Sequence, residues 1–96
     1  MSGAATYGDV VLAVIREEYA PLKHAAEYLA RDAGATPRTA ENWLSGLCAP
    51  TGEKLLNLMA SCERLHDAVV AASIERRATL RTRARAAADY ARTRKQ

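Results

Sequence analysis

The chain of 96 residues has no phenylalanine, one tryptophan and four tyrosines, so few large side chains are available to fill a core. Apolar residues make up 49% of the sequence, but alanine supplies much of that fraction. A chain of this length suits one small domain, and a core of small side chains buries little apolar area. We therefore expect a single domain with a modest core, for which association with a second copy would add burial.

Cysteine and histidine are also scarce. Cys48 and Cys62 lie fourteen residues apart, and His24 and His66 lack zinc-finger spacing, so we expect no metal site and no cofactor. We expect both cysteines to be reduced, as in a cytoplasmic protein; a disulfide or a bridge between subunits is the alternative. The first residues have no basic segment followed by an apolar one, and no apolar run approaches a membrane span, so we expect neither a secretion signal nor a membrane partner.

Positive charge is concentrated at the C-terminal end. Residues 1–75 hold six Lys or Arg and ten Asp or Glu, a net charge of −4. Residues 76–96 hold eight basic residues and one acid, a net charge of +7, and the two parts together give +3. A basic segment of this kind indicates contact with a polyanion. We divide the chain into a domain at 1–75 and a basic, Ala/Arg-rich helical extension at 76–96.

The spacing of apolar residues predicts an all-α fold. Thr6 and Asp9 form a capping-box pattern before the first apolar run, and residues 1–6 are expected to be disordered. Ser61 is expected to cap the last helix. The five predicted helices span residues 7–19, 22–33, about 37–45, 53–60, and about 62 to the C-terminus.

Residues 22–46 combine signals that end one helix and start another. Gly34 suits a turn that needs positive φ, and Ala30 four residues before it lets two helices cross closely. Thr36 can cap a new helix, and Pro37 suits that helix's first turn. The stretch therefore predicts two short helices joined by a tight turn.

The second of these helices has one apolar and one polar face. Ala40, Trp43 and Leu44 supply the side that we expect to be buried, and Gly46 with Pro50 ends the helix. Base stacking is an alternative role for Trp43, but its spacing favours the core. Four apolar residues of the next helix are expected to pack under Trp43: Leu55, Leu56, Leu58 and Met59.

In this stretch the sequence resembles the helix-turn-helix of the lambda-repressor-like (XRE-type) bacterial regulators. The resemblance covers about thirty residues closely. The residues that carry it are the motif-core residues Ala30, Gly34, Ala40 and Trp43, together with Thr36, Gly46 and Pro50. The sequence departs from the family at Ala40, where Val or Ile is usual, and at Ala26, where a phosphate-binding Gln is frequent. The resemblance implies a five-helix lambda-repressor-like domain with its motif at 22–46, here followed by an extended basic C-terminal helix.

The resemblance also implies that residues 37–45 form a recognition helix that enters the major groove of double-stranded DNA. Arg38 can bond two acceptors of guanine, Asn42 can pair with adenine, and Glu41 can accept from cytosine or orient Arg38. The expected base contacts are Pro37, Arg38, Glu41 and Asn42. The expected phosphate contacts are Thr36, Thr39, Ser45, Lys23, Arg77, Arg81 and Arg85. The alternative is that this polar face is an ordinary solvated surface.

The C-terminal segment allows two functional interpretations. At about 100° per residue, one narrow stripe holds Leu80, Ala84, Ala87 and Ala91, and a neighbouring stripe holds Arg77, Arg81, Arg85 and Arg92. Either the first stripe packs against a second subunit, or a mobile tail screens DNA phosphates; a solvated basic end without a role is the alternative to both. We place the dimer contact chiefly at 69–80. We assign the arginines to DNA, because the rest of the chain is net acidic.

These patterns favour sequence-specific binding of double-stranded DNA by a homodimeric bacterial or phage transcriptional regulator, located in the cytoplasm with the nucleoid and occupying a near-palindromic operator. The alternatives are an antitoxin-type protein-interaction module and a DNA-architectural accessory factor of a mobile element. An Arg-rich tail argues against the antitoxin, whose usual tail is acidic or mixed. We expect no enzyme, since Cys62 and His66, four residues apart, lack a third orienting group and a cleft.

Overall fold

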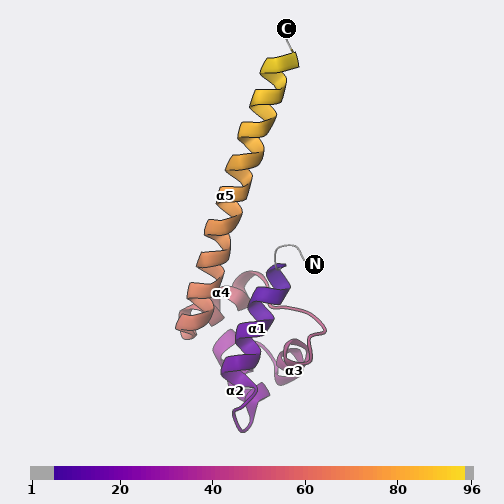
Figure 1. Ribbon diagram of the computed structural model, residues 1–96. Coiled ribbons are helices and arrows are strands. Elements are labelled where there is room, and N and C mark those ends of the chain that lie inside the picture. The colour runs from indigo at the N-terminus through magenta and orange to yellow at the C-terminus, as the bar shows by residue number, and fades with distance from the viewer. Residues whose placement is uncertain (1–5, 95–96) are drawn as a thin grey trace.

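Five helices and no strand make up residues 6–94, the part of the chain that the computed structural model describes (Figure 1). The helices are α1 (Tyr7–Tyr19), α2 (Ala25–Ala33), α3 (Pro37–Ser45), α4 (Gly52–Ser61) and α5 (Glu63–Arg94). The prediction of an all-α chain is confirmed. Of the N-terminal residues that the sequence predicted to be disordered, 1–5 lie outside the described residues, and Thr6 caps α1.

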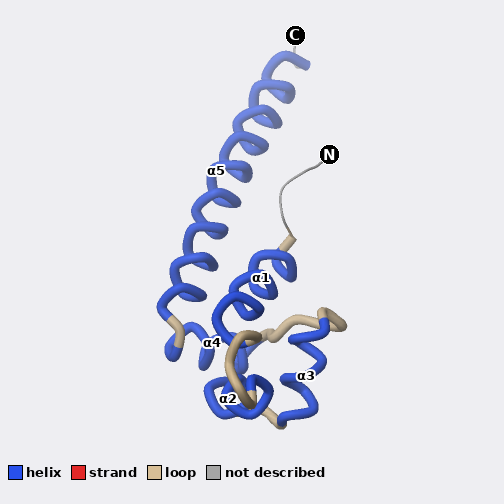
Figure 2. Tube along the Cα trace, turned by 60° about the horizontal axis from the view of Figure 1, so that its bottom comes forward, coloured by secondary structure: helices blue, strands red, loops and turns tan. Residues whose placement is uncertain are grey.

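The helix α5 extends far beyond the other four helices (Figures 1 and 2). Its 32 residues give a length of about 48 Å at a rise of about 1.5 Å per residue. The radius of gyration is 17.8 Å, whereas a compact chain of this length would have about 12.5 Å. Every residue from Ser73 to Thr93 is exposed. The boundary predicted at residue 75 thus falls within one unbroken helix.

The core is formed by side chains from all five helices, of which α1 contributes the most. Ile15, Leu29, Leu58 and Leu65, from α1, α2, α4 and α5, are fully buried, and Trp43 of α3 is 3% exposed. Ala30 and Ala40 of the predicted motif core are buried with them, whereas Gly34 is exposed in the turn. Since α2, α3 and α4 each contribute one large buried side chain, the positions of these three helices depend on a few contacts.

The helix α2 begins at Ala25 and not at Leu22, so its predicted start is wrong. His24 has φ of 63°, a left-handed conformation that cannot continue a right-handed helix. The N–H of Leu22 instead donates to the carbonyl of Tyr19 across a turn (3.0 Å). Leu22 is 45% exposed and does not belong to the apolar face of α2.

The predicted cap of the last helix is also wrong. Ser61 is the last residue of α4, and its hydroxyl donates to the carbonyl of Asp32 at 3.5 Å. The chain then becomes extended at Cys62, whose carbonyl accepts from the N–H of His66 in the first turn of α5 (3.1 Å). Cys62 is buried in the core, whereas Cys48 is exposed, and both are free thiols.

One of the four side chains expected under Trp43 lies outside the core. Leu58 is fully buried, and Leu55 with Met59 packs against the core, but Leu56 is 65% exposed. At about 100° per residue these four positions cover more of the helix surface than α4 buries. Leu56 lies at the edge of that arc, which explains its exposure.

A buried hydrogen bond ties α1 to α2. The hydroxyl of Tyr19 donates to the carboxylate of Asp32 at 2.7 Å, and Tyr19 is 6% exposed. Burial, followed by this hydrogen bond, raises the pKa of Tyr19 well above its ordinary value of 10.0. The folded chain therefore keeps the Tyr19 proton at alkaline pH after the unfolded chain has lost it.

We expect stability to decline as the pH rises through about 10, partly because of Tyr19. Below this pH both states hold the proton and the full contribution is present; above it the unfolded state holds fewer protons, so unfolding becomes easier. Tyr19→Phe should lose part of the stability at neutral pH and show a shallower decline between about pH 9 and pH 11. Chemical denaturation across this range measures both slopes, with Tyr28→Phe as the control. Equal slopes of the unfolding free energy against pH in the parent and in Tyr19→Phe would contradict a raised pKa of Tyr19 in the folded state.

Candidate functional site

The helices α2 and α3 are joined by a three-residue turn that starts at Gly34. Gly34 has φ of 71°, and the N–H of Ala35 donates to the carbonyl of Ala30 at 2.9 Å, which is the bonding of a glycine-ended helix. Asn57 of α4 donates to the carbonyl of Ala33 at 2.9 Å. Hydrogen bonds from the turn's own backbone and from α4 therefore hold this segment in place, and the turn sets where α3 begins.

The hydroxyl groups around α3 differ in what they can still bind. Thr36 Oγ1 accepts from the N–H of Thr39 (3.2 Å) and donates to Thr39 Oγ1 (3.0 Å). Ser45 donates to the carbonyl of Asn42 at 3.0 Å. No described residue accepts the hydroxyl proton of Thr39. Of the three hydroxyls predicted to contact phosphate, that of Thr39 is thus the free donor.

The surface of α3 is divided between the core and the solvent. Ala40 and Trp43 are buried. Arg38, Glu41 and Asn42 lie on the opposite side, with Arg38 and Glu41 exposed and Asn42 half-buried. Neither Arg38 nor Glu41 forms an ion pair with a described residue. Together with the exposed Pro37, the predicted base contacts form one outward face whose polar groups are available.

Arg16 of α1 joins this region although the sequence did not indicate it. Gly46, which ends α3, has φ of 85°, and a Cβ at this position would collide with the guanidinium of Arg16. Arg16 therefore places a positive charge at the C-terminal end of α3, where the helix dipole favours it. It lies thirty residues before Gly46 on another helix, so only the fold brings the two together.

Two further residues of this region lie on or before α2. Lys23 is exposed in the turn that precedes the helix. The ring face of Tyr28 is covered by Arg31 of the same helix, with 5.0 Å between the guanidinium carbon and the ring centroid. Both partners of this cation–π pair lie on α2, so the pair does not join α2 to another helix.

The predicted phosphate contacts on α5 are not next to α3. Arg77, Arg81 and Arg85 are exposed, and α5 packs on α1 and α4 but not on α3. Figure 1 shows the C-terminal half of α5 pointing away from the other helices. The candidate residues thus form two groups, one on α3 and its turn, the other on α5.

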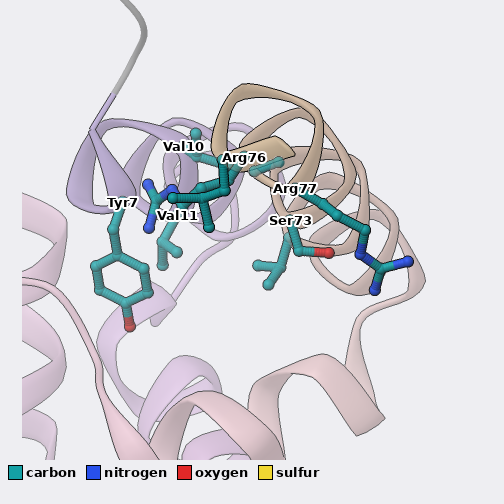
Figure 3. Close-up of a pocket in the computed structure, with 9 residues that line it drawn as sticks. Tyr7, Val10, Val11, Ser73, Arg76 and Arg77 are labelled. Atoms are coloured by element: carbon teal, nitrogen blue, oxygen red, sulfur yellow. The ribbon is translucent and has the colours of Figure 1, made fainter. Parts of the chain in front are cut away.

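A groove of about 360 Å³ lies between α1 and α5 (Figure 3). Most of its lining is apolar, and its polar residues are at the rim. Arg76 extends from α5 towards Tyr7, while Arg77 points away. The hydroxyl of Tyr7 donates to the carbonyl of Pro50, which fixes one wall of the groove. The lining residues are Tyr7, Val10, Val11, Val69, Ala72, Ser73, Arg76, Arg77 and Leu80.

The described part of the chain holds no group of three or more His, Cys, Asp or Glu side chains placed for a metal ion. No helix among residues 6–94 is both long and apolar enough to span a bilayer. Cys62 is buried, whereas His66 is exposed beside Asp67 (3.1 Å).

The fold and the site define an all-α protein with one exposed polar helix face and one projecting basic helix. No protein-family model matches the chain, and neither a curated protein nor a solved structure matches it. The function is therefore inferred from the arrangement of α2, α3 and α5.

Proposed function

We propose that the chain binds double-stranded DNA through α3, with α2, the turn at Gly34 and α3 acting as a lambda-repressor-like helix-turn-helix. The observation that carries the proposal is the division of α3, whose Trp43 side is buried while Arg38, Glu41 and Asn42 face outward. A helix with its side chains is about 10–12 Å across, and the major groove is about 12 Å wide. An exposed, firmly anchored helix of this kind can enter the groove.

The outward groups of α3 suit base edges. Arg38, whose guanidinium forms no ion pair with a described residue, can donate two parallel hydrogen bonds to guanine, and Asn42 can both donate to and accept from adenine. Glu41 can accept from cytosine or hold Arg38 in position. Pro37 places apolar atoms at the N-terminal end of α3, where side chains of such a helix meet the bases.

Phosphates would be bound by groups around this face. The candidates are the hydroxyl of Thr39 on α3, the guanidinium of Arg16 at the C-terminal end of α3 and the ammonium of Lys23 in the turn before α2. Residues 1–75 carry a net charge of −4, so this part alone would be repelled by a polyanion. The arginines of α5 supply the compensating charge and contact phosphates away from the bases that α3 contacts.

The biological role that follows is a bacterial or phage transcriptional regulator, cytoplasmic and associated with the nucleoid, which occupies a near-palindromic operator as a homodimer. The two-fold symmetry of a dimer would match the symmetry of the operator. A second candidate, an antitoxin-type module, is favoured by the exposure of α5 over residues 73–93. In that case the chain would co-purify with a protein partner at a fixed ratio.

Selection from a pool of random DNA duplexes tests the proposal. We expect enrichment of one motif with two related half-sites over successive rounds of binding at about 0.15 M salt, since the site is built to contact base edges. A matched variant that replaces Arg38, Glu41 and Asn42 by Ala and stays folded should not enrich this motif. A parent protein that leaves the pool composition unchanged would overturn the proposal.

A further inference from the structure

We propose that two copies associate through antiparallel α5 helices related by a two-fold axis at Leu80. The C-terminal half of each α5 then lies along the groove between α1 and α5 of the other copy. This inference deepens the proposed function, because it names the contact that forms the homodimer. Its test contains no DNA, so it can fail without the DNA-binding proposal failing, and the reverse.

The groove is an apolar surface that is open to solvent among residues 6–94 of a single copy. Val10 and Val11 of α1 line it (Figure 3). Val69 of α5 lines it as well, and Leu80 continues the lining onto the projecting half of α5. Leu80 is 54% exposed. A continuous apolar patch on a small protein marks an interaction surface. The segment that would cover it must be slender enough to enter between two helices.

The spacing along α5 fits a second α5 as that segment. The side of α5 that faces the groove carries the positions 69, 73, 76, 80, 84, 87 and 91. Successive positions in this series are four, three, four, four, three and four residues apart. This order is the same in both directions from Leu80, so in an antiparallel pair residue i of one copy meets residue 160 − i of the other. The opposed residues are Val69 with Ala91, Ser73 with Ala87, Arg76 with Ala84, and Leu80 with its own copy.

Side-chain size supports this pairing. Within each unlike pair, the residue on the groove half, at position 69, 73 or 76, is larger than the alanine that it meets from the projecting half. Small residues let two helices approach closely, and larger ones then occupy the space left between them. The alanines at 84, 87 and 91, which bury little area alone, thus have larger partners in the groove.

Charge favours the antiparallel direction. Residues 76–96 carry +7 and residues 1–75 carry −4. A parallel pair would place two segments of +7 side by side. In the antiparallel pair residues 76–84 meet the same residues of the other copy, but residues 85–94, with three Arg and one Asp, meet residues 66–75, with two acids and no Lys or Arg, so fewer like charges are opposed. Arg81 and Arg85 lie roughly 100° or more around the helix from the centre of the paired face, so they stay exposed for phosphates.

The area is sufficient for a specific dimer. Overlap over residues 69–91 is about 34 Å long, and half the circumference of a helix about 10 Å across is about 16 Å. Each copy would then cover about 540 Å², about 1,100 Å² in total, which passes the roughly 1,000 Å² of a specific interface. Packing would also stabilise the exposed half of α5, since an isolated helix is marginal in water.

The arrangement also displaces the two cores along α5. Ala68 lies in the part of α5 that packs against the core, twelve residues before Leu80. The two copies of Ala68 are then about 36 Å apart along α5, at about 1.5 Å per residue.

Disulfide cross-linking in a Cys48→Ser background tests the pairing. We expect a native mass twice that of the 10.4 kDa chain. Leu80→Cys should cross-link with itself, and a mixture of Ser73→Cys and Ala87→Cys should form the mixed product, while Thr82→Cys, on the opposite side of α5, should not cross-link. All four positions are exposed, so the variants should fold.

Ala91→Cys distinguishes the two directions. In the antiparallel pair the two copies of residue 91 are about 33 Å apart and cannot form a disulfide. In a parallel pair they are adjacent, so self-cross-linking of Ala91→Cys would overturn the inference. A monomeric native mass, or equal cross-linking at 80 and 82, would overturn it as well. If a molecule other than a second copy of the chain occupied the groove, the native mass of the purified chain would be that of a monomer.

Discussion

Replacing Trp43 by alanine is expected to lower the free energy of unfolding by about 3–5 kcal/mol. Trp43 is 3% exposed and is the one tryptophan of the chain. Its neighbours in the core include Ala30, Ala33 and Ala40, side chains too short to close the cavity that the indole leaves. Small domains have about 5–15 kcal/mol of stability in total, so this loss is a large part of it.

Chemical denaturation followed by circular dichroism measures the effect, because the variant has no tryptophan fluorescence. Trp43→Phe should lose less, since most of the volume is kept. Leu47→Ala is the matched surface control: Leu47 is 75% exposed, and its removal should change stability by less than about 0.5 kcal/mol. If Trp43→Ala unfolded like the Leu47 variant, α3 would not be anchored by its indole.

Arg38→Ala is expected to weaken binding to the selected DNA motif by about 1–3 kcal/mol, roughly 5- to 150-fold, and to remove discrimination at one base pair. Asn42→Ala should have a similar effect at a different base pair. Arg38 is exposed, so the folded state should keep its stability. Competition binding with motif variants, each changed at one position, measures both the affinity and the lost preference.

Arg81→Ala is the matched control, since it removes the same charge from an exposed position on α5. It should weaken binding to all duplexes alike and reduce the slope of log affinity against log salt by up to about 0.9. If Arg38→Ala behaved in the same sequence-independent way, Arg38 would contact phosphate and not a base. An unchanged salt slope for Arg81→Ala would remove α5 from the DNA contact.

The elements that the sequence predicted best have local signals at both ends. The capping box of Thr6 and Asp9 starts α1, and Thr36, Pro37 and Gly46 bound α3. These groups act over three or four residues, so they are visible in a short stretch of sequence. The start of α2 has no such signal, because the left-handed His24 caps it without a side-chain hydrogen bond.

The candidate site was predicted in part for the same reason. Arg38, Glu41 and Asn42 share a face with one another because of helical spacing alone, which a sequence contains. The position of Arg16 beside Gly46 depends on how α1 packs against α3. The groove depends on how α5 packs against α1 and on where α5 extends beyond it. These are contacts between distant segments, and spacing along a single helix does not contain them.

The continuity of α5 also restricts how its length can vary. One helix carries Leu65 in the core and Leu80 in the projecting half without a break. A single inserted residue between them would rotate everything beyond it by about 100° and lengthen the helix by about 1.5 Å. Seven inserted residues would restore the orientation to within about 20° while moving the C-terminal half about 10.5 Å outward. Related chains of different length are therefore expected to differ in this segment by close to a whole number of helical turns, as about seven or about eleven residues give.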